Sequence, residues 1–267
     1  MKVIPLSVWD LAIASSLVFL LALLSLLLKL KIGKNILIAG TRMTLQLTLL
    51  GLVLKVIFEY VSVYWLTLMT LFMLIAAGRE VTRRQKRRFT GLWGFGLGTS
   101  SMFVSAFTIT ILALLFIIQN KPWYQPQYAI PVLGMMLGNT MNGISLGFDR
   151  LTTTAWHQKA VIEGRLMLGQ DWSHAIGDIR RECVRGGLIP IVNMMSIAGL
   201  VSLPGMMTGQ ILAGNPPIEA VKYQIMIMFM IAGGTGLGTV CAVWFGSRRL
   251  FDSRQRLRLD RLSLNKH

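Results

Sequence analysis

The stretch VWDLAIASSLVFLLALLSLLL (residues 8–28) decides the class of protein to which this chain belongs. An α-helix rises 1.5 Å per residue, so about 20 apolar residues cross the roughly 30 Å hydrocarbon layer of a bilayer. Asp10 is the only charged residue in the stretch, and no small-residue cleavage motif follows it. A retained transmembrane helix is therefore expected, rather than a secretory signal peptide.

The rest of the chain has the same character. Of its 267 residues, 54% are hydrophobic and 14% are charged, and the mean hydropathy is +0.60. A soluble domain carries about 25% charged residues. Apolar runs recur at residues 8–28, 36–58, 61–78, 91–118, 129–148, 188–213 and 224–246. We therefore predict an all-α polytopic membrane helix bundle with about seven transmembrane helices, inserted in the cell membrane as a multi-pass protein.

Basic residues fall in every second connection between these runs. One set of connections contains only Lys2, Lys121 and Lys222, whereas the other contains the basic residues at 29–34, 79–88, 150–185 and 248–266. The positive-inside rule puts the second set in the cytoplasm, so the N-terminus is expected outside and the C-terminus inside. Topology then accounts for the net charge of +16, and no nucleic acid partner is expected. Binding of RNA or of anionic lipid is the less favoured alternative.

Pairs of glycines indicate closely packed helices, and the catalytic motifs that an enzyme would need are missing from the sequence. Glycines four residues apart let helix backbones approach closely, and such pairs occur at 94 and 98, 134 and 138, 143 and 147, and 234 and 238. Cys183 and Cys241 form no metal or disulfide pattern. The sequence also lacks a Gly-x-x-x-x-Gly-Lys-[Ser/Thr] phosphate loop. We therefore expect no ATP hydrolysis, no catalytic residues and no cofactor on this chain.

One long polar connection, DRLTTTAWHQKAVIEGRLMLGQDWSHAIGDIRRECVRGG (residues 149–187), lies on the predicted cytoplasmic side. Gly169 is expected to separate a helix that extends the fifth run from a short helix over residues 172–179, which Asp171 caps. Gly186 and Gly187 are expected to close the connection. Such an arm suits the docking of another protein. The predicted regions are five helices (1–148), the arm (149–187), two further spans with the first broken near Pro204 (188–246), and a basic tail (247–267).

Two sets of residues resemble a known family. Glu163, Gly169 and Ile179 have the spacing of the E-A-A-x-x-x-G loop with which permeases of ABC transporters contact their ATPase subunits, although Gly164 and Arg165 replace its two alanines. The chain from about residue 40 to 251 resembles the FetB-type permease family, through the segments GTRMTLQLTLLGLVLKVIF (40–58), PVLGMMLGNTMNGISLGFDRL (131–151), EGRLMLG (163–169) and GLVSLPGMMTGQILAGNPPIEAVKYQI (199–225).

This resemblance implies a membrane permease subunit that works with a separate cytoplasmic ABC ATPase, as two permeases and two ATPases. The complex would export its substrate from the cytoplasm, and ATP and Mg²⁺ would bind to the partner subunit. Members of the family are linked to iron, aluminium and a nucleotide sugar, so iron or another metal is the expected cargo. The arm residues expected at the ATPase are Glu163, Gly169, Asp171, Trp172 and Ile179.

Polar residues inside the spans are the candidates for a translocation path. Arg42 and Gln46 lie four residues apart on one face of the second run, and charges within a membrane usually face protein or water. Snorkelling of Arg42 to the inner surface is the alternative. In the fifth run, Asn139 and Asn142 either form hydrogen bonds between helices or line the path.

Proline interrupts the sixth run, because Pro204 lacks an N–H donor and clashes with the preceding turn. Ser202 is expected to cap a new half-helix with Pro204 in its first turn, so the run unwinds from Ser202 to Gly205. Broken helices can line a transport path, here with Met206 and Met207 beside the break. Methionines bind soft metals such as Cu⁺ or simply pack, and packing is favoured.

Two other classes of protein are less consistent with the sequence. A secondary carrier of a metal or small solute would run on an ion gradient without ATP, and a proton-driven one would need acidic residues or histidines within the spans. A membrane enzyme would need a cluster of nucleophilic, metal-binding or acid–base groups. The sequence shows neither feature.

Overall fold

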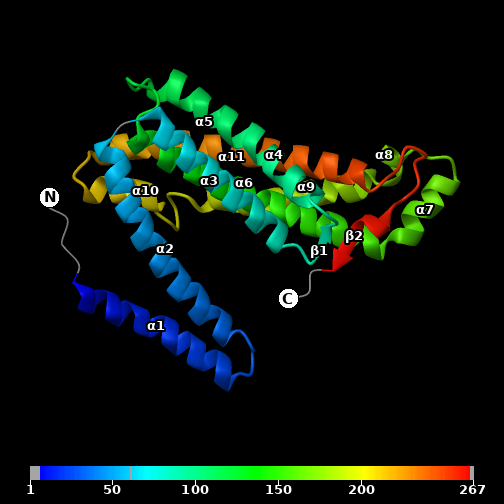
Figure 1. The fold of residues 1–267 in the computed structure, drawn as a ribbon, viewed down its shortest axis with the longest axis horizontal. Coiled ribbons are helices and arrows are strands. Elements are labelled where there is room, and N and C mark those ends of the chain that lie inside the picture. Colours follow the sequence, from blue (N-terminus) through cyan, green and yellow to red (C-terminus); the bar gives the residue numbers. More distant parts are fainter. Residues whose placement is uncertain (1–6, 61, 265–267) are drawn as a thin grey trace.

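The computed structural model describes residues 7–60 and 62–264, and these residues are mostly helical. Figure 1 shows long helices running side by side, with short elements gathered at one end. In chain order the elements are α1 (Val8–Leu27), α2 (Gly33–Glu59), α3 (Val63–Arg83), β1 (Arg87–Phe89), α4 (Trp93–Met102), α5 (Thr108–Leu112), α6 (Pro126–His157), α7 (Lys159–Met167), α8 (Trp172–Ala175), α9 (Gly177–Ile197), α10 (Gly205–Leu212), α11 (Pro217–Arg249) and β2 (Leu262–Leu264). π-helical turns at Phe103–Phe107 and Ala113–Ile118 continue α4 and α5.

Five helical segments in the described part of the chain are long and apolar enough to cross a membrane. They are Val8–Leu27, Gly33–Glu59, Val63–Arg84, Trp93–Ile118 and Pro217–Arg249. The prediction of a helical, multi-pass protein is confirmed. The predicted fifth run lies within α6, and the predicted sixth run is divided between α9 and α10, so these two segments are less apolar or interrupted. The number of seven crossings stays a prediction.

The core of the protein lies where α6 packs against α3, α9 and α11. Large apolar side chains such as Met136, Ile144 and Phe148 point from α6 into this core and are fully buried. Their burial is typical of a helix with neighbours on several sides, which explains why α6 need not be as apolar as a helix surrounded by lipid.

Glycines hold the central helices at close range. A Cβ atom on Gly143 would lie 2.6 Å from Thr239 Oγ1 and 2.7 Å from Thr235 Cγ2, and one on Gly187 would lie 2.7 Å from the Gly143 carbonyl oxygen. Only glycine fits such a backbone approach. Gly186 and Gly187 therefore lie inside α9, and the prediction that they end the arm is wrong, since they pack against α6 rather than form a turn.

The α1–α2 hairpin stands apart from the other helices over most of its length in Figure 1, but near the end of α2 Ile57 is buried with Leu66 of α3 and Ala129 of α6. Its two helices contact each other, and a Cβ on Gly33 would approach the Ala22 carbonyl oxygen to 3.0 Å. Most side chains on both helices are exposed, including apolar ones along their whole length. Lipid or another protein chain must therefore cover these surfaces in a membrane.

The end of the molecule that carries α7 and α8 also contains a two-stranded antiparallel sheet of β1 and β2 (Figure 1). This small sheet is the only strand pairing among the named elements of the described residues, and the predicted all-α class is confirmed. The segment after α11 folds back, because Arg261 Nη1 donates to the Arg249 carbonyl oxygen at 2.7 Å and Phe251 and Leu262 are buried with Phe89. The predicted basic tail is thus a packed segment as far as residue 264.

We predict that Gly143→Ala destabilises the protein, whereas Gly138→Ala on the same helix does not. Both changes add a methyl group and gain about 1 kcal/mol of helix propensity. Only Gly143 lacks space, since nothing lies within 4 Å of a Cβ on Gly138. Overpacking costs about 1–3 kcal/mol. The measurement is the thermal midpoint of each variant in detergent, taken as the temperature at which half of the monodisperse gel-filtration peak is lost. Equal midpoints would contradict the close-packing account.

Candidate functional site

The chain between α9 and α10 leaves helical geometry at residues 198–204. Gly199 adopts φ +79°, a left-handed conformation that favours glycine, and its N–H donates to the Ser202 carbonyl oxygen at 3.0 Å. Pro204 is itself the N-cap residue of α10, and no side chain caps this helix. The prediction that Ser202 caps a half-helix with proline in its first turn is therefore wrong, because α10 begins one residue after Pro204.

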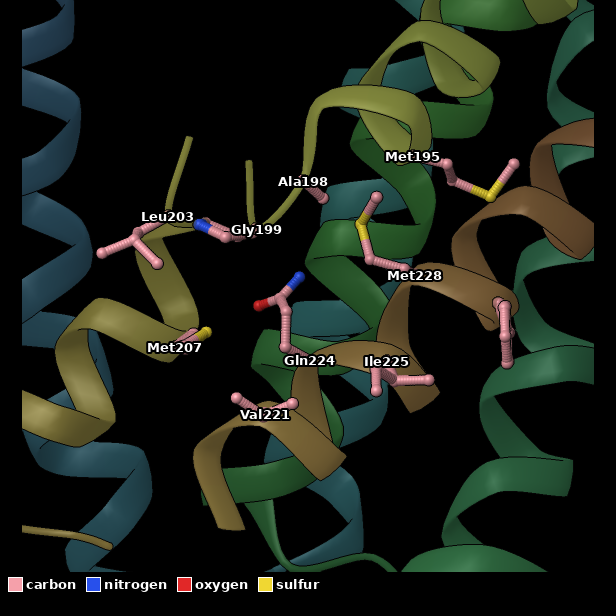
Figure 2. A pocket seen from close by; sticks show the side chains of 11 residues that line it. Met195, Ala198, Gly199, Leu203, Met207, Val221, Gln224, Ile225 and Met228 are labelled. Atoms are coloured by element: carbon pink, nitrogen blue, oxygen red, sulfur yellow. The ribbon is translucent and has the colours of Figure 1, made fainter. Parts of the chain in front are cut away.

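A pocket of about 530 Å³ lies beside this break, between α9, α10 and α11. Figure 2 shows Met195, Met207 and Met228 around it, one from each helix, and Gln224 reaching into the space between them. Gln224 is only 8% exposed, and its Oε1 atom has no hydrogen-bond partner among the described residues. The pocket can therefore hold an apolar or polarisable group, whereas the unpaired amide oxygen is itself buried in its wall.

The predicted residues near the break do not all meet in this pocket. Pro204 and Met207 line it, whereas Met206 lines a neighbouring cavity of about 380 Å³ with Gln210 and Tyr223. Ser202 and Gly205 are exposed beside the break. The described part of the chain contains no group of three or more His, Cys, Asp or Glu side chains that could hold a metal ion.

A second, polar cleft of about 840 Å³ lies between α2, α3 and α6. Arg42 and Gln46 line it from α2, and Glu80, Arg83 and Arg84 line it from α3. The polar lining thus combines three guanidinium groups with one carboxylate, so the local charge is positive.

The two asparagines of α6 have different hydrogen-bond partners, and only Asn142 bonds to a residue that lines this cleft. Arg84 Nη1 donates to Asn142 Oδ1 at 2.6 Å, and Arg84 Nε lies 3.2 Å from Glu80 Oε1. Asn139 Nδ2 instead donates to the Met135 carbonyl oxygen of its own helix at 2.8 Å. Glu80 and Arg84 lie beyond the predicted third run, which ends at residue 78, so they were not predicted as residues of this cleft. Continued helical spacing through Arg83 was the feature that could have revealed them.

The arm at the opposite end of α9 consists of α7, a turn at Gly169 and the short helix α8. Gly169 has φ +87°, and Asp171 accepts a hydrogen bond from the His174 backbone N–H at 3.0 Å. Hydrogen bonds from the His174 side chain and from its backbone hold the pKa of Asp171 below its usual value, so this carboxylate stays charged at neutral pH. The predicted single helix over residues 172–179 is divided, because α8 ends at Ala175 and α9 begins at Gly177.

The base of the arm is fixed to the bundle. The Trp172 ring lies edge-on to Trp244, with centroids 5.9 Å apart, and also contacts Phe251. The Trp172 backbone N–H donates to Gln255 Oε1 at 2.9 Å, and Ile179 is buried. These contacts join the arm to α11 and to the segment that follows it.

The tip of the arm is apolar and exposed. Met167 is 87% exposed and Leu168 is 85% exposed, directly before Gly169. Glu163 lies farther back on α7, partly exposed, with its carboxylate 3.8 Å from Lys159 Nζ. The arm therefore has a base fixed to the bundle and an apolar tip that no other described part of the chain covers.

Comparisons with known proteins place these features in context. A family model described as "Uncharacterised protein family (UPF0014)" matches residues 8–251. A UPF0014 membrane protein of Synechocystis is 40% identical over 223 residues, covering 82% of this chain and 84% of the relative. The probable iron export permease protein FetB of Escherichia coli is 34% identical over 259 residues, covering 95% of each chain. The protein ALUMINUM SENSITIVE 3 of Arabidopsis thaliana is 31% identical over 234 residues, covering 87% of this chain and 83% of the relative. No solved structure matches.

We predict that Gln224→Leu raises the thermal midpoint of the protein. A buried oxygen without a partner costs about 1–3 kcal/mol, and leucine removes that cost at similar volume. Gln224→Glu, which puts a charge in the same place, is expected to lower the midpoint. A lower midpoint for Gln224→Leu would show that the amide oxygen is paired in the membrane.

Proposed function

The chain belongs to the UPF0014 family of membrane proteins, and we propose that it is the permease subunit of an ABC exporter driven by a separate ATP-binding subunit. Permease function is supported by the relative named a probable iron export permease. Because the sequence lacks a phosphate loop, the proposal assigns ATP and Mg²⁺ to the partner subunit. In this proposal the N-terminus is outside and the arm is cytoplasmic, and two copies of the chain form the transport unit.

The exposed apolar tip of the arm carries this proposal. In this proposal Met167 and Leu168, at the end of α7, face the cytoplasm together with the basic residues of the arm and of the segment after α11. Apolar groups projecting into water mark a protein interaction site when they cluster. A groove on the ATPase subunit would take up this tip, as helical anchors fit into apolar grooves in other complexes.

The connection from the arm to the cavities gives the proposal a mechanism. Movement of the arm on ATP binding is passed to α11 through Trp172 and Trp244, and to α9 through the continuous helix that begins beside α8. These two helices line the pocket at the break. Closing of the two ATPase subunits would therefore change access to that pocket, while the cleft of Arg42 and Arg84 receives the cargo from the cytoplasm.

The cargo in this proposal is iron or another metal, carried as a complex rather than as a bare cation. Arg42, Arg83 and Arg84 line the inner cleft, and Glu80 already lies 3.2 Å from Arg84. Like charges in a partly dehydrated cleft repel, so Fe²⁺ or Fe³⁺ gains no favourable interaction there. An anionic complex of the metal meets complementary guanidinium groups.

We predict that the double variant Met167→Ser with Leu168→Ser retains membrane insertion but loses its ATPase partner. Two buried anchors at an interface typically contribute 1 kcal/mol or more each, so co-purification should fall by about tenfold or more. Val161→Ser is the matched control, because Val161 is also exposed on α7 but lies away from the tip. Unchanged co-purification of the double variant would favour an ATP-independent carrier.

We further predict that ferric citrate stimulates the ATPase activity of the reconstituted complex more than Fe²⁺ does. Arg42→Gln should lower that stimulation several-fold, since it removes a guanidinium from the cleft. Lys55→Gln removes a charge from the same helix about 20 Å farther along and should leave the stimulation unchanged. A stronger response to Fe²⁺, or equal effects of the two variants, would contradict an anionic cargo.

A further inference from the structure

A groove of about 660 Å³ between α9 and α11 is not used by the proposed transport function. Its cytoplasmic end is formed by Arg180, Arg181 and Arg185 of α9. Beyond these, its lining is almost entirely apolar and comes from both helices, with Val184, Leu188, Ile189, Val192 and Asn193 on α9 and Val240 and Trp244 on α11.

The length of this groove fits one leaflet of a membrane. From Arg181 to Val192 the α9 axis extends about 17 Å, at 1.5 Å per residue. One half of a bilayer has a hydrocarbon layer of about 15 Å. In the proposed orientation of the chain, the arginines lie at the depth of the inner headgroups, while the apolar part runs alongside the acyl chains. Trp244 lies at the same end, as is usual for tryptophan at a membrane interface.

The three arginines differ in their contacts. Arg181 Nη2 pairs with Asp178 Oδ1, and both side chains are exposed, so this ion pair is weak. Arg180 donates to Ser173 Oγ at 3.4 Å. Arg185 is exposed and makes no hydrogen bond or ion pair with any residue that the structure describes. Its planar guanidinium can bind a phosphate group by donating two parallel hydrogen bonds.

We propose that this groove binds an anionic phospholipid of the inner leaflet. The phosphate lies on Arg185 and Arg181, and one acyl chain lies along Leu188, Val192 and Val240. A water-soluble ATPase subunit does not fill an apolar groove at membrane depth. A lipid fits both the arginine end and the apolar part of the groove. Basic pockets between transmembrane helices on the cytoplasmic side are sites of this kind.

The position of the groove connects the lipid with the arm. Arg180 contacts Ser173 of α8, and Trp244 contacts Trp172 at the base of the arm. A bound lipid would therefore brace the junction of α8, α9 and α11. The binding of an anionic lipid rests on the groove and its charges and not on transport, whereas its assignment to the inner leaflet rests on the proposed orientation.

Native mass spectrometry of the full chain, released from detergent, tests the proposal. Dioleoyl phosphatidylglycerol is titrated against dioleoyl phosphatidylcholine. We expect the wild type to retain the anionic lipid at least tenfold more tightly. The double variant Arg181→Gln with Arg185→Gln should lose that preference while its affinity for phosphatidylcholine stays unchanged. Dihexanoyl phosphatidylglycerol, which has the same headgroup but short chains, should bind much more weakly.

A charge-matched control distinguishes binding in the groove from general electrostatic attraction of anionic lipid to this basic end of the molecule. Arg254→Gln with Arg256→Gln removes two positive charges at the same end of the molecule but outside the groove. Equal loss in this control would overturn the proposal, as would equal binding of the two headgroups or equal binding of the short-chain lipid. A lipid-free dimer that becomes monomeric in the groove variant would overturn it too, and would assign the groove to a second copy. Gel filtration of each variant verifies folding.

Discussion

The close approach of α6, α9 and α11 at Gly143, Gly187 and Thr239 is the contact on which the rest of the structure depends. Lipid chains are as apolar as helix surfaces, so burial of apolar side chains gives helices little reason to associate in a membrane. Contact at van der Waals distance replaces that driving force, and glycine brings the backbones to that distance. The same contact fixes α6, α9 and α11 relative to one another. The pocket lies toward one end of α9 and α11, and the arm lies at the other end.

The helix α11 links the two ends of the molecule directly. Gln224 lies in the pocket beside the break, and Trp244 contacts the arm about 30 Å farther along the axis. Because α9 runs beside it from the arm to the break, two packed helices join the base of the arm to the pocket. The two cavities differ in chemistry: the pocket is lined by thioethers and one amide, and the inner cleft by guanidinium groups.

Local physical chemistry explains which features could be predicted from sequence. Runs of apolar residues identify membrane helices because hydrocarbon offers no hydrogen-bond partner to the backbone. The interruption near Pro204 follows from proline geometry, and the turn at Gly169 needs the left-handed conformation that glycine adopts. Spacing along a single helix also brought Arg42 and Gln46 together on one side, and both line the inner cleft.

Contacts between distant parts of the chain could not be derived in this way. Arg84 meets Asn142 across 58 residues, and β1 pairs with β2 across a still longer stretch of chain. Met206 and Met207 are neighbours in sequence but face different cavities, because consecutive residues of a helix point in different directions and α11 borders α10 at both cavities. The sequence by itself therefore determined the membrane class, the helices, the break and the arm, since these follow from hydropathy and backbone geometry within a few residues. The tertiary structure alone decided which side chains share a cavity, because that depends on how glycine contacts align helices far apart in the chain.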